Sequence, residues 1–195
     1  MTQSPRARSA YHHGDLPNTL IEEGARLLAE SGVAGFSLRK LAQRAGVTVA
    51  APSHHFGSAR GVFTAIAQRA FEKLADQMAA EAQAAGTPQD AVLAMCLAYF
   101  HMQTTDPGYA GVMFRLDLLD ATDIDFRARA SHAFGLLESA LARAAAPRVA
   151  AREVEITARA LWATAQGLTV LPMIERDEIE PILRATVAAH LRQLF

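Results

Sequence analysis

The feature that most constrains this 195-residue chain is a succession of helix-type apolar spacings separated by helix start and stop signals. No alternation of apolar and polar residues long enough for a β-strand interrupts them, and no internal repeat is present. The stretches that we expect to be helical are residues 16–32, 38–45, 49–56, 58–85, 88–104, 108–119, 123–146, 149–171 and 178–194. The spacing therefore predicts an all-α fold of about nine helices.

The ends of these stretches carry residues that favour helix termini. Side-chain oxygens suited to capping a helix N-terminus stand at Asp15, Ser37, Thr48 and Thr87. Gly46 is expected to form the turn between the second and third helices, because a positive φ is least costly at glycine. Pro52 lies four residues past Thr48 and forfeits only one early backbone bond, so a short third helix can include it. Helix, short helix, glycine turn and short helix is the order of a helix-turn-helix module, whose last helix enters a DNA major groove.

Hydropathy and cysteine content indicate where such a chain works. No apolar run approaches the roughly 18 to 20 residues that span a membrane. The N-terminal sequence MTQSPRARSAYHHGD lacks the apolar core of a secretion signal. Cys96 is the only cysteine, which excludes an internal disulfide and fits a reducing compartment. We therefore expect a cytoplasmic protein with no membrane contact.

Charge is distributed unevenly, although the formal net charge is −1. Through Lys73 the chain has nine Lys or Arg and five Asp or Glu, a net charge of +4, so the remainder carries −5. A basic front end on a slightly acidic body favours a polyanion as partner of the front end. An uneven solvated surface is the alternative explanation.

The front end resembles a known family. The sequence YHHGDLPNTLIEEGARLLAESGVAGFSLRKLAQRAGVTVAAPSHHF is similar to the DNA-binding domain of the TetR/AcrR family of transcriptional regulators, over roughly residues 11–63 and most specifically in FSLRKLAQRAGVT…HF. The AAP of the third helix, the leading YHHGDL and the later LWATAQGLTVL (161–171) resemble one subgroup, which has a Trp-containing eighth helix. The resemblance implies a helix-turn-helix domain at 11–60 and a helical effector-binding and dimerisation domain at 61–195.

Matched residue by residue, the resemblance also implies the DNA contacts. Ser37, Arg39, Thr48 and His55 would hold phosphates, while Val49, Ala50 and Ala51 would face base edges. Because those three side chains are apolar, their best partners are thymine methyl groups, and Ser53 and His54 are left to add hydrogen bonds. Discrimination between sequences would then depend on thymine methyls and on DNA shape.

Three positions depart from the family pattern. Ser53 stands where the family usually has Tyr, and Ala59 stands where it usually has Lys. Arg60 is the candidate substitute for that lysine, although one residue rotates a side chain by about 100° around a helix. Gln166 stands where the subgroup usually has His.

The resemblance implies an effector pocket and a dimer interface in the second domain. The candidate effector-binding residues are Met95, Tyr99, Met102, Met113, Phe114, Phe134, Trp162 and Gln166. Tyr99 and Gln166 are the polar anchors and no buried cation is evident, so we expect a small, mainly apolar effector. The candidate dimer residues are Ala160, Ala163, Gly167, Leu168, Ile182, Leu183, Val187 and Leu191. Ordinary packing of the monomer's own core is the alternative for both sets.

Three other classes of function fit parts of the sequence: a metal site, an enzyme and a purely structural bundle. The pairs His12–His13 and His54–His55 suggest metal ligands, but adjacent helical side chains point about 100° apart and seldom chelate one ion. His101 near Asp106, or His132 near Glu138, suggests acid–base chemistry, yet no nucleophile motif or phosphate loop accompanies them. A purely structural bundle leaves the basic module unexplained, and Cys96 is either a sensor thiol or a buried small hydrophobe.

Taken together, the sequence predicts a ligand-responsive repressor that acts as a homodimer on double-stranded operator DNA. We expect no catalytic activity, cofactor or metal.

Overall fold

The computed structural model describes residues 15–171 and 173–194, which form nine helices and no strand. This confirms the predicted all-α fold. The helices are α1 (Leu16–Gly35), α2 (Leu38–Arg44), α3 (Ala50–Phe56), α4 (Ala59–Ala84), α5 (Pro88–Thr105), α6 (Pro107–Ala110), α7 (Ile124–Ala144), α8 (Ala151–Leu168) and α9 (Arg176–Leu194). Within the two described ranges, none of the helices is both long enough and apolar enough to cross a membrane.

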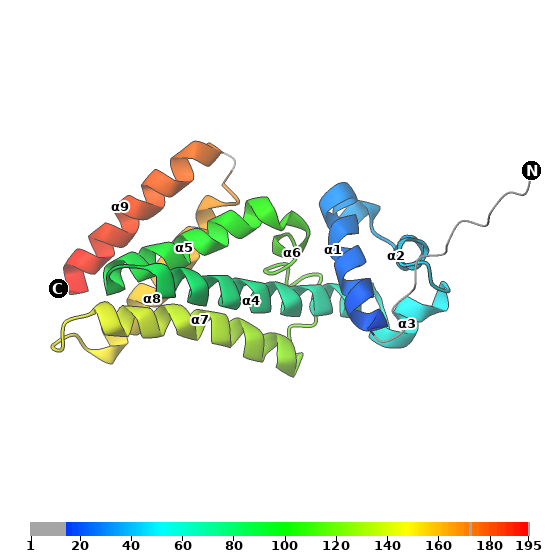
Figure 1. Ribbon diagram of the computed structural model, residues 1–195, viewed down its shortest axis with the longest axis horizontal. Coiled ribbons are helices and arrows are strands. Elements are labelled where there is room, and N and C mark those ends of the chain that lie inside the picture. The colour runs from blue at the N-terminus through cyan, green and yellow to red at the C-terminus, as the bar shows by residue number, and fades with distance from the viewer. Residues whose placement is uncertain (1–14, 172, 195) are drawn as a thin grey trace, which may run out of the picture.

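Helix α4 connects the two ends of the molecule. Helices α1–α3 gather at one end, helices α5–α9 form the body, and α4 runs from the first group into the second (Figure 1). Its first turns pack on α1, where a Cβ added to Gly24 would lie 2.9 Å from Cδ1 of Ile66. The expected domain boundary after residue 60 therefore falls inside one continuous helix, and its N-terminal limit at residue 11 lies outside the described residues.

Most helix starts lie where the capping residues placed them. Thr87 Oγ1 accepts a hydrogen bond from the backbone N–H of Asp90 (3.1 Å). The other side chains that accept such a bond at a helix start are those of Ser37, Ser58 and Asp123. These caps satisfy N–H groups that have no partner inside the helix, so they fix where α2, α4, α5 and α7 begin.

Two of the expected caps differ from the prediction. Asp15 is the N-cap residue of α1, as expected, but its carboxylate accepts from the side chain of Asn18 and makes no capping bond to the backbone. Helix α3 begins at Ala50, because Val49 already has helical dihedral angles (φ −58°, ψ −26°) and takes the N-cap position without a side-chain bond. Thr48 contributes only its backbone carbonyl, which accepts from the N–H of Ala51 (3.0 Å).

The helix predicted at 108–119 is also wrong. Helix α6 has four residues, and turns closed by bonds such as Leu118 N–H to Arg115 O (2.7 Å) follow it. Tertiary contacts explain the difference. Gly108 is pressed against α1 so closely that a Cβ would lie 1.9 Å from the carbonyl oxygen of Ala25. Farther along, the chain is also bonded to α4, where the N–H of Asp120 donates to the hydroxyl of Thr64 (2.9 Å).

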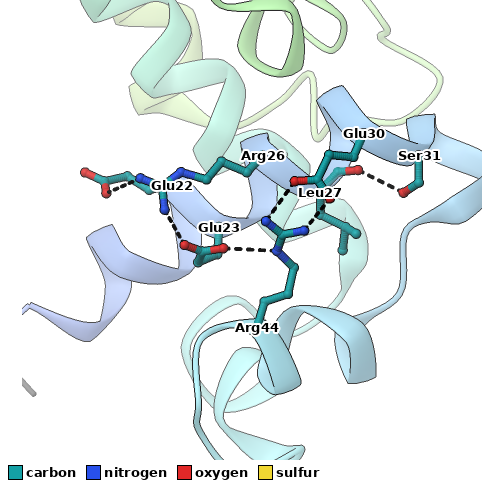
Figure 2. Close-up of polar contacts among 7 residues, drawn as sticks. All are labelled: Glu22, Glu23, Arg26, Leu27, Glu30, Ser31 and Arg44. Carbon is teal, nitrogen blue, oxygen red and sulfur yellow. Dashed lines mark hydrogen bonds and ion pairs between the residues drawn. The ribbon is translucent and has the colours of Figure 1, made fainter. Parts of the chain in front are cut away.

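An arginine joins the first two helices of the N-terminal unit. Arg44 extends from α2 to α1, where its guanidinium binds the carboxylates of Glu23 (Nε to Oε2, 3.0 Å) and Glu30 (Nη2 to Oε1, 2.9 Å) (Figure 2). These hydrogen bonds raise the pKa of Arg44, and the hydrogen bond from Arg44 lowers the pKa of Glu30. Because α3 follows α2 after a tight turn, this contact also helps to hold α3 in place.

Replacing Arg44 should make the stability of the protein less dependent on acid pH. The contribution of Glu30 is present above the ordinary carboxyl pKa of 4.5 and is lost as the pH falls through the lowered pKa. We expect Arg44→Met to unfold a few degrees below the wild type at neutral pH, as befits an exposed ion pair, and the difference to shrink at about pH 3. Thermal unfolding followed by circular dichroism measures both.

The matched control is Arg39→Met, on the same helix. Arg39 makes no ion pair with any residue in the described ranges. Any difference in unfolding temperature between Arg39→Met and the wild type should be the same at neutral pH and at acid pH. A gap for Arg44→Met that is equal at both pH values would contradict the electrostatic account.

Candidate nucleic-acid interface and cavity

The turn between α2 and α3 has the geometry that the sequence predicts. Gly46 has a φ of 67°, and its N–H bonds to the carbonyl of Gln43 (3.2 Å) while the N–H of Val47 bonds to that of Ala42 (3.0 Å). Pro52 is buried as the third residue of α3, where its missing N–H costs no helical hydrogen bond. Helix α3 is therefore a short helix held on a firmly closed turn.

Helix α3 presents to solvent most of the residues expected to meet DNA. Val49 is 61% exposed. The other exposed members of the set are Thr48, Ala50, Ser53, His54 and His55, whereas Ala51 is half-buried. The rings of His54 and His55 meet edge to face, with centroids 5.3 Å apart. An apolar patch with polar groups at one end is thus available for contact.

The start of α2 provides the adjoining polar surface. Ser37 is occupied as the cap of α2, since its Oγ accepts from the N–H of Lys40 (3.2 Å). The ammonium of Lys40 donates to the carbonyl of Gly35 (2.8 Å). Arg39 is exposed and has no hydrogen bond or ion pair to another described residue. Its guanidinium is therefore available to an external anion.

The other cations of the basic front end mostly have partners within the chain. Besides Arg44, the side chains in ion pairs with carboxylates are those of Arg26, Arg69 and Lys73. The net charge of +4 already counts those carboxylates and includes Arg6 and Arg8, which lie outside the described residues; within residues 15–73 the cations without a carboxylate partner are Arg39, Lys40 and Arg60. Position on the surface, rather than net charge, identifies the cation suited to a phosphate.

The side chain of Arg60, expected to contact a phosphate, binds another part of the protein. Its guanidinium donates to the backbone carbonyls of Asp117 (3.1 Å) and Leu119, in the connection between α6 and α7. Both acceptors belong to the C-terminal part of the molecule. The expected phosphate contact by Arg60 is corrected accordingly: in this structure the side chain binds the protein itself.

The histidines give no support to the metal or acid–base alternatives. In the residues that the structure describes, no three His, Cys, Asp or Glu side chains gather as a metal site requires. Over the same ranges, His101 makes no bond to Asp106 and His132 makes none to Glu138. The pair His12–His13 lies outside the described residues.

Five of the eight expected effector residues line one cavity inside the body. They are Met95, Tyr99, Phe114, Trp162 and Gln166. The cavity is about 10 Å³, scarcely room for one water molecule, because aromatic rings fill the space. The ring of Phe114 packs edge to face on Tyr99 (centroids 5.7 Å apart) and on Trp162 (6.4 Å). The site is therefore closed as it stands.

The remaining expected effector residues lie beside the cavity. Met102 and Met113 are buried in the surrounding core, and Phe134 packs on Trp162 with ring centroids 5.7 Å apart. The lining residues that sequence reasoning missed are Met78, Cys96, Leu137 and Ala165. They come from four helices, and their helical spacing marks them only as buried.

Two side chains of the lining have shifted pKa values. Burial raises the pKa of Tyr99, against hydrogen bonds with Thr169 and Gln103 that lower it, so its hydroxyl already has partners. Burial raises the pKa of Cys96 to about 12. A thiol with that pKa stays protonated and unreactive, which favours the buried hydrophobe over the sensor.

The candidate dimer residues divide into two groups. Leu168, Leu183, Val187 and Leu191 are buried against the monomer's own core, so assigning them to the dimer interface is wrong. The physical reason is that α9 packs on α5 and α8, so that Leu183, Val187 and Leu191 of α9 and Leu168 of α8 all lie inside the monomer. Ala163 is exposed, and the others, which are Ala160, Gly167 and Ile182, are half-buried.

An uncovered apolar stripe runs along α8 and beyond its end. Ile156, Ala160, Ala163 and Gly167 follow one another at spacings of four, three and four residues, which places them on one face. Ile156 is 53% exposed, and the stripe continues in the exposed Val170. Sequence analysis missed both, although the same spacing would have indicated Ile156. An apolar stripe of small residues permits close approach of another helix.

Comparison with known proteins agrees with this geometry. Residues 20–66, which include the turn and both short helices, match the family model described as bacterial regulatory proteins, tetR family. No curated protein matches the sequence.

Solved structures resemble the whole chain. A protein with unknown function from Rhodococcus sp. RHA1 is 24% identical with a TM-score of 0.75, covering 96% of this chain and 99% of its own. A TetR-family transcriptional regulator from Streptomyces coelicolor is also 24% identical, with a TM-score of 0.68 and coverage of 92% and 99%. The TetR family transcriptional regulator PfmR from Thermus thermophilus is 22% identical, with a TM-score of 0.65 and coverage of 89% and 97%. Residues 20–66 are thus similar to the tetR family of bacterial regulatory proteins, and the chain as a whole has the same overall fold as these solved structures.

Proposed function

We propose that this protein is a cytoplasmic, homodimeric repressor that binds operator DNA and releases it when a small apolar effector enters the C-terminal domain. The observation that carries the proposal is the exposed α3, closed by the Gly46 turn, within the segment that matches the tetR family model. Its test is selection of binding sites from random or genomic DNA fragments at moderate salt, followed by a gel shift with the selected fragment.

The chemistry of α3 suggests how DNA would be read. Val49 and Ala50 offer only apolar contact, which suits thymine methyl groups in the major groove. Ser53 and His54 add hydrogen-bonding groups, and the exposed side chains of His55, Thr48 and Ser37 would contact phosphates. With few bidentate partners for bases, much of the discrimination would come from methyl contacts and DNA shape.

A dimer would supply the affinity that one short helix lacks. Two recognition helices one helical turn or more apart read two half-sites at once. The α8 stripe defined by Ile156, Ala160, Ala163 and Gly167 is the proposed contact, paired with its own copy around a two-fold axis. Ile182 of α9 lies half-buried and would join it. Small residues on the stripe would let the two copies approach closely.

The cavity suggests the class of effector. Its lining is apolar except for Tyr99 and Gln166, and no charged side chain is buried in the described part of the chain. A charged metabolite would find no countercharge there, and its desolvation would go uncompensated. An apolar ligand with one or two hydrogen-bonding groups fits, because Gln166 can both donate and accept. Since the cavity is only about 10 Å³, entry requires the aromatic rings to move.

Two substitutions should separate phosphate contacts from base contacts. Arg39→Ala should weaken binding about equally on all DNA sequences and lower the salt slope by about one, since a phosphate contact carries no base information. Ala50→Asp should abolish specific binding by charge repulsion in the groove while leaving the fold intact. Fluorescence anisotropy of labelled fragments over a range of salt concentrations measures both effects. Unchanged affinity in both variants would show that Arg39 and Ala50 do not contact DNA.

The dimer face is tested by a bulky residue at Gly167. A Cβ added at Gly167 meets nothing within 4 Å in the monomer, so we expect Gly167→Trp to fold but to push a second copy away. We expect the wild type to sediment as a dimer at micromolar concentration and the variant as a monomer. Gly135→Trp, at an equally open helical glycine on α7, is the control that should remain dimeric. A dimeric Gly167→Trp would mean that this face only borders solvent.

The effector class is tested by fluorescence of Trp162. Titration with apolar compounds that carry a hydroxyl or carbonyl should change its emission, whereas a sugar phosphate should not. Gln166→Leu should lower the affinity for compounds with a hydroxyl or carbonyl by about tenfold, because a single hydrogen bond is lost. The affinity for a plain hydrocarbon should not change. Gln89→Leu, at the N-terminus of α5 and outside the cavity, is the control. A strongly hydrophilic effector would disprove this picture of the cavity.

A further inference from the structure

One face of α4 carries three polar side chains at four-residue spacing, and each of them binds the same connection. The spacing places them in a row along the helix. We name the row Arg60, Thr64 and Gln68 the α4 latch, and the connection between α6 and α7 that it binds is residues 117–123.

Thr64 is the centre of the latch. It is 4% exposed and is the one buried polar side chain in the ranges that the structure describes. Its hydroxyl donates to the carbonyl of Arg60 (2.9 Å) and accepts from the backbone N–H of Asp120 (2.9 Å), so both of its roles are used. Without the hydroxyl, that N–H would lose its bond to α4, and a lost bond to a partly buried donor is costly. The contact therefore favours one position of 117–123 on α4.

The outer members of the latch hold the two ends of the connection. Arg60 binds the carbonyls of Asp117 and Leu119 at its beginning. At its end, Gln68 Nε2 donates to Asp123 Oδ1 (2.8 Å), and the same oxygen accepts from the N–H of Phe126 (2.7 Å). Asp123 is the cap of α7, so Gln68 ties the start of that helix to α4.

The connection begins next to the cavity. Phe114, three residues before Asp117, packs on Trp162 and Tyr99 and also on Phe71 of α4, with ring centroids 5.6 Å apart in the last case. Hydrogen bonds restrict the backbone between Phe114 and the latch, since the N–H groups of residues 118 and 119 both bond to the carbonyl of Arg115 (2.7 and 3.2 Å). A displacement of the backbone at Phe114 would therefore be passed on to residues 117–123.

The other end of the latch lies next to α3. Arg60 is the second residue of α4, whose cap Ser58 follows directly on Gly57, the residue that ends α3. The first turn of α4 is thus joined to α3 with no flexible linker between them. Whatever fixes the first turn of α4 relative to the body also fixes α3.

We propose that Arg60, Thr64 and Gln68 are positioning residues that couple the cavity side chain Phe114 to α3 through residues 117–123. In this arrangement Arg60 acts on carbonyl groups of the protein and not on a DNA phosphate. The inference rests on the proposed function, because it concerns the same DNA-binding and effector sites. Coupling between two sites is reciprocal, so DNA bound at α3 must alter the cavity even with no effector present.

The experiment uses the full-length protein and Trp162, the only tryptophan of the chain. The wild type is titrated with the selected DNA fragment while binding is followed by anisotropy of labelled DNA and the cavity by Trp162 emission. We expect the emission to change in step with binding. Thr64→Val should still bind the fragment, with affinity changed by about five- to tenfold, but should lose most of the emission change. Thr64→Ser, which keeps the hydroxyl, should restore it.

Further variants keep the test decisive. Gln68→Ala replaces a half-buried side chain and should reduce the emission change even if Thr64→Val folds poorly. Gln77→Ala, also on α4 but without a bond to 117–123, should leave it unchanged. Arg60→Ala should leave the salt slope of binding at its wild-type value, whereas loss of a phosphate contact would lower it by about 0.9. A lowered slope would return Arg60 to the DNA interface and overturn its part in the latch.

The outcomes separate this inference from the proposed function. If the wild type binds no DNA, the proposed function fails and the latch fails with it. If the wild type binds DNA but Trp162 emission stays constant, or if folded Thr64→Val and Gln68→Ala keep the full change, the latch is overturned while DNA binding stands.

Discussion

Helix α4 is packed by both ends of the molecule, and the positions of α3 and of the cavity depend on that one helix. Val62 and Ile66 in its first half lie against Gly24 of α1, and Met78 in its second half lines the cavity. Between them, buried side chains of the two ends form one continuous apolar cluster. An interior packed in this way resists deformation, so a displacement at one end is carried along α4 rather than absorbed.

The parts of the fold that the sequence predicts well are those set by neighbours in the chain. A cap such as Ser37 or Thr87 and a turn glycine such as Gly46 act on backbone groups three residues away or fewer, so the local sequence locates them. The stretch 108–119 failed because its shape is set from a distance. Gly108 meets the backbone of α1 and Asp120 bonds to α4, and neither contact leaves a local signature.

The candidate sites divide along the same line. The face of α3 was predictable, because a short helix on a tight turn can bury only one side. The partner of a long side chain was not predictable, as Arg60 illustrates. Sequence spacing places its Cα on α4, but its guanidinium binds carbonyls almost sixty residues away in the chain. Leu183 and Val187 show a second limit. Periodicity identifies an apolar stripe on α9, but whether that stripe faces this chain or a second copy depends on where α5 lies.

The closed cavity bears on how an effector would act. A ligand can bind only the fraction of molecules in which Phe114 and Trp162 have moved apart, so the free energy of opening is subtracted from its affinity. That cost is also what would give the ligand its effect, because a compound that bound the closed and open forms equally would shift nothing. Phe114 belongs to the cavity and, through Phe71, to α4. A ligand that displaced this ring would therefore remove packing from α4, which is joined to α3, and so would change the surroundings of α3 without touching it.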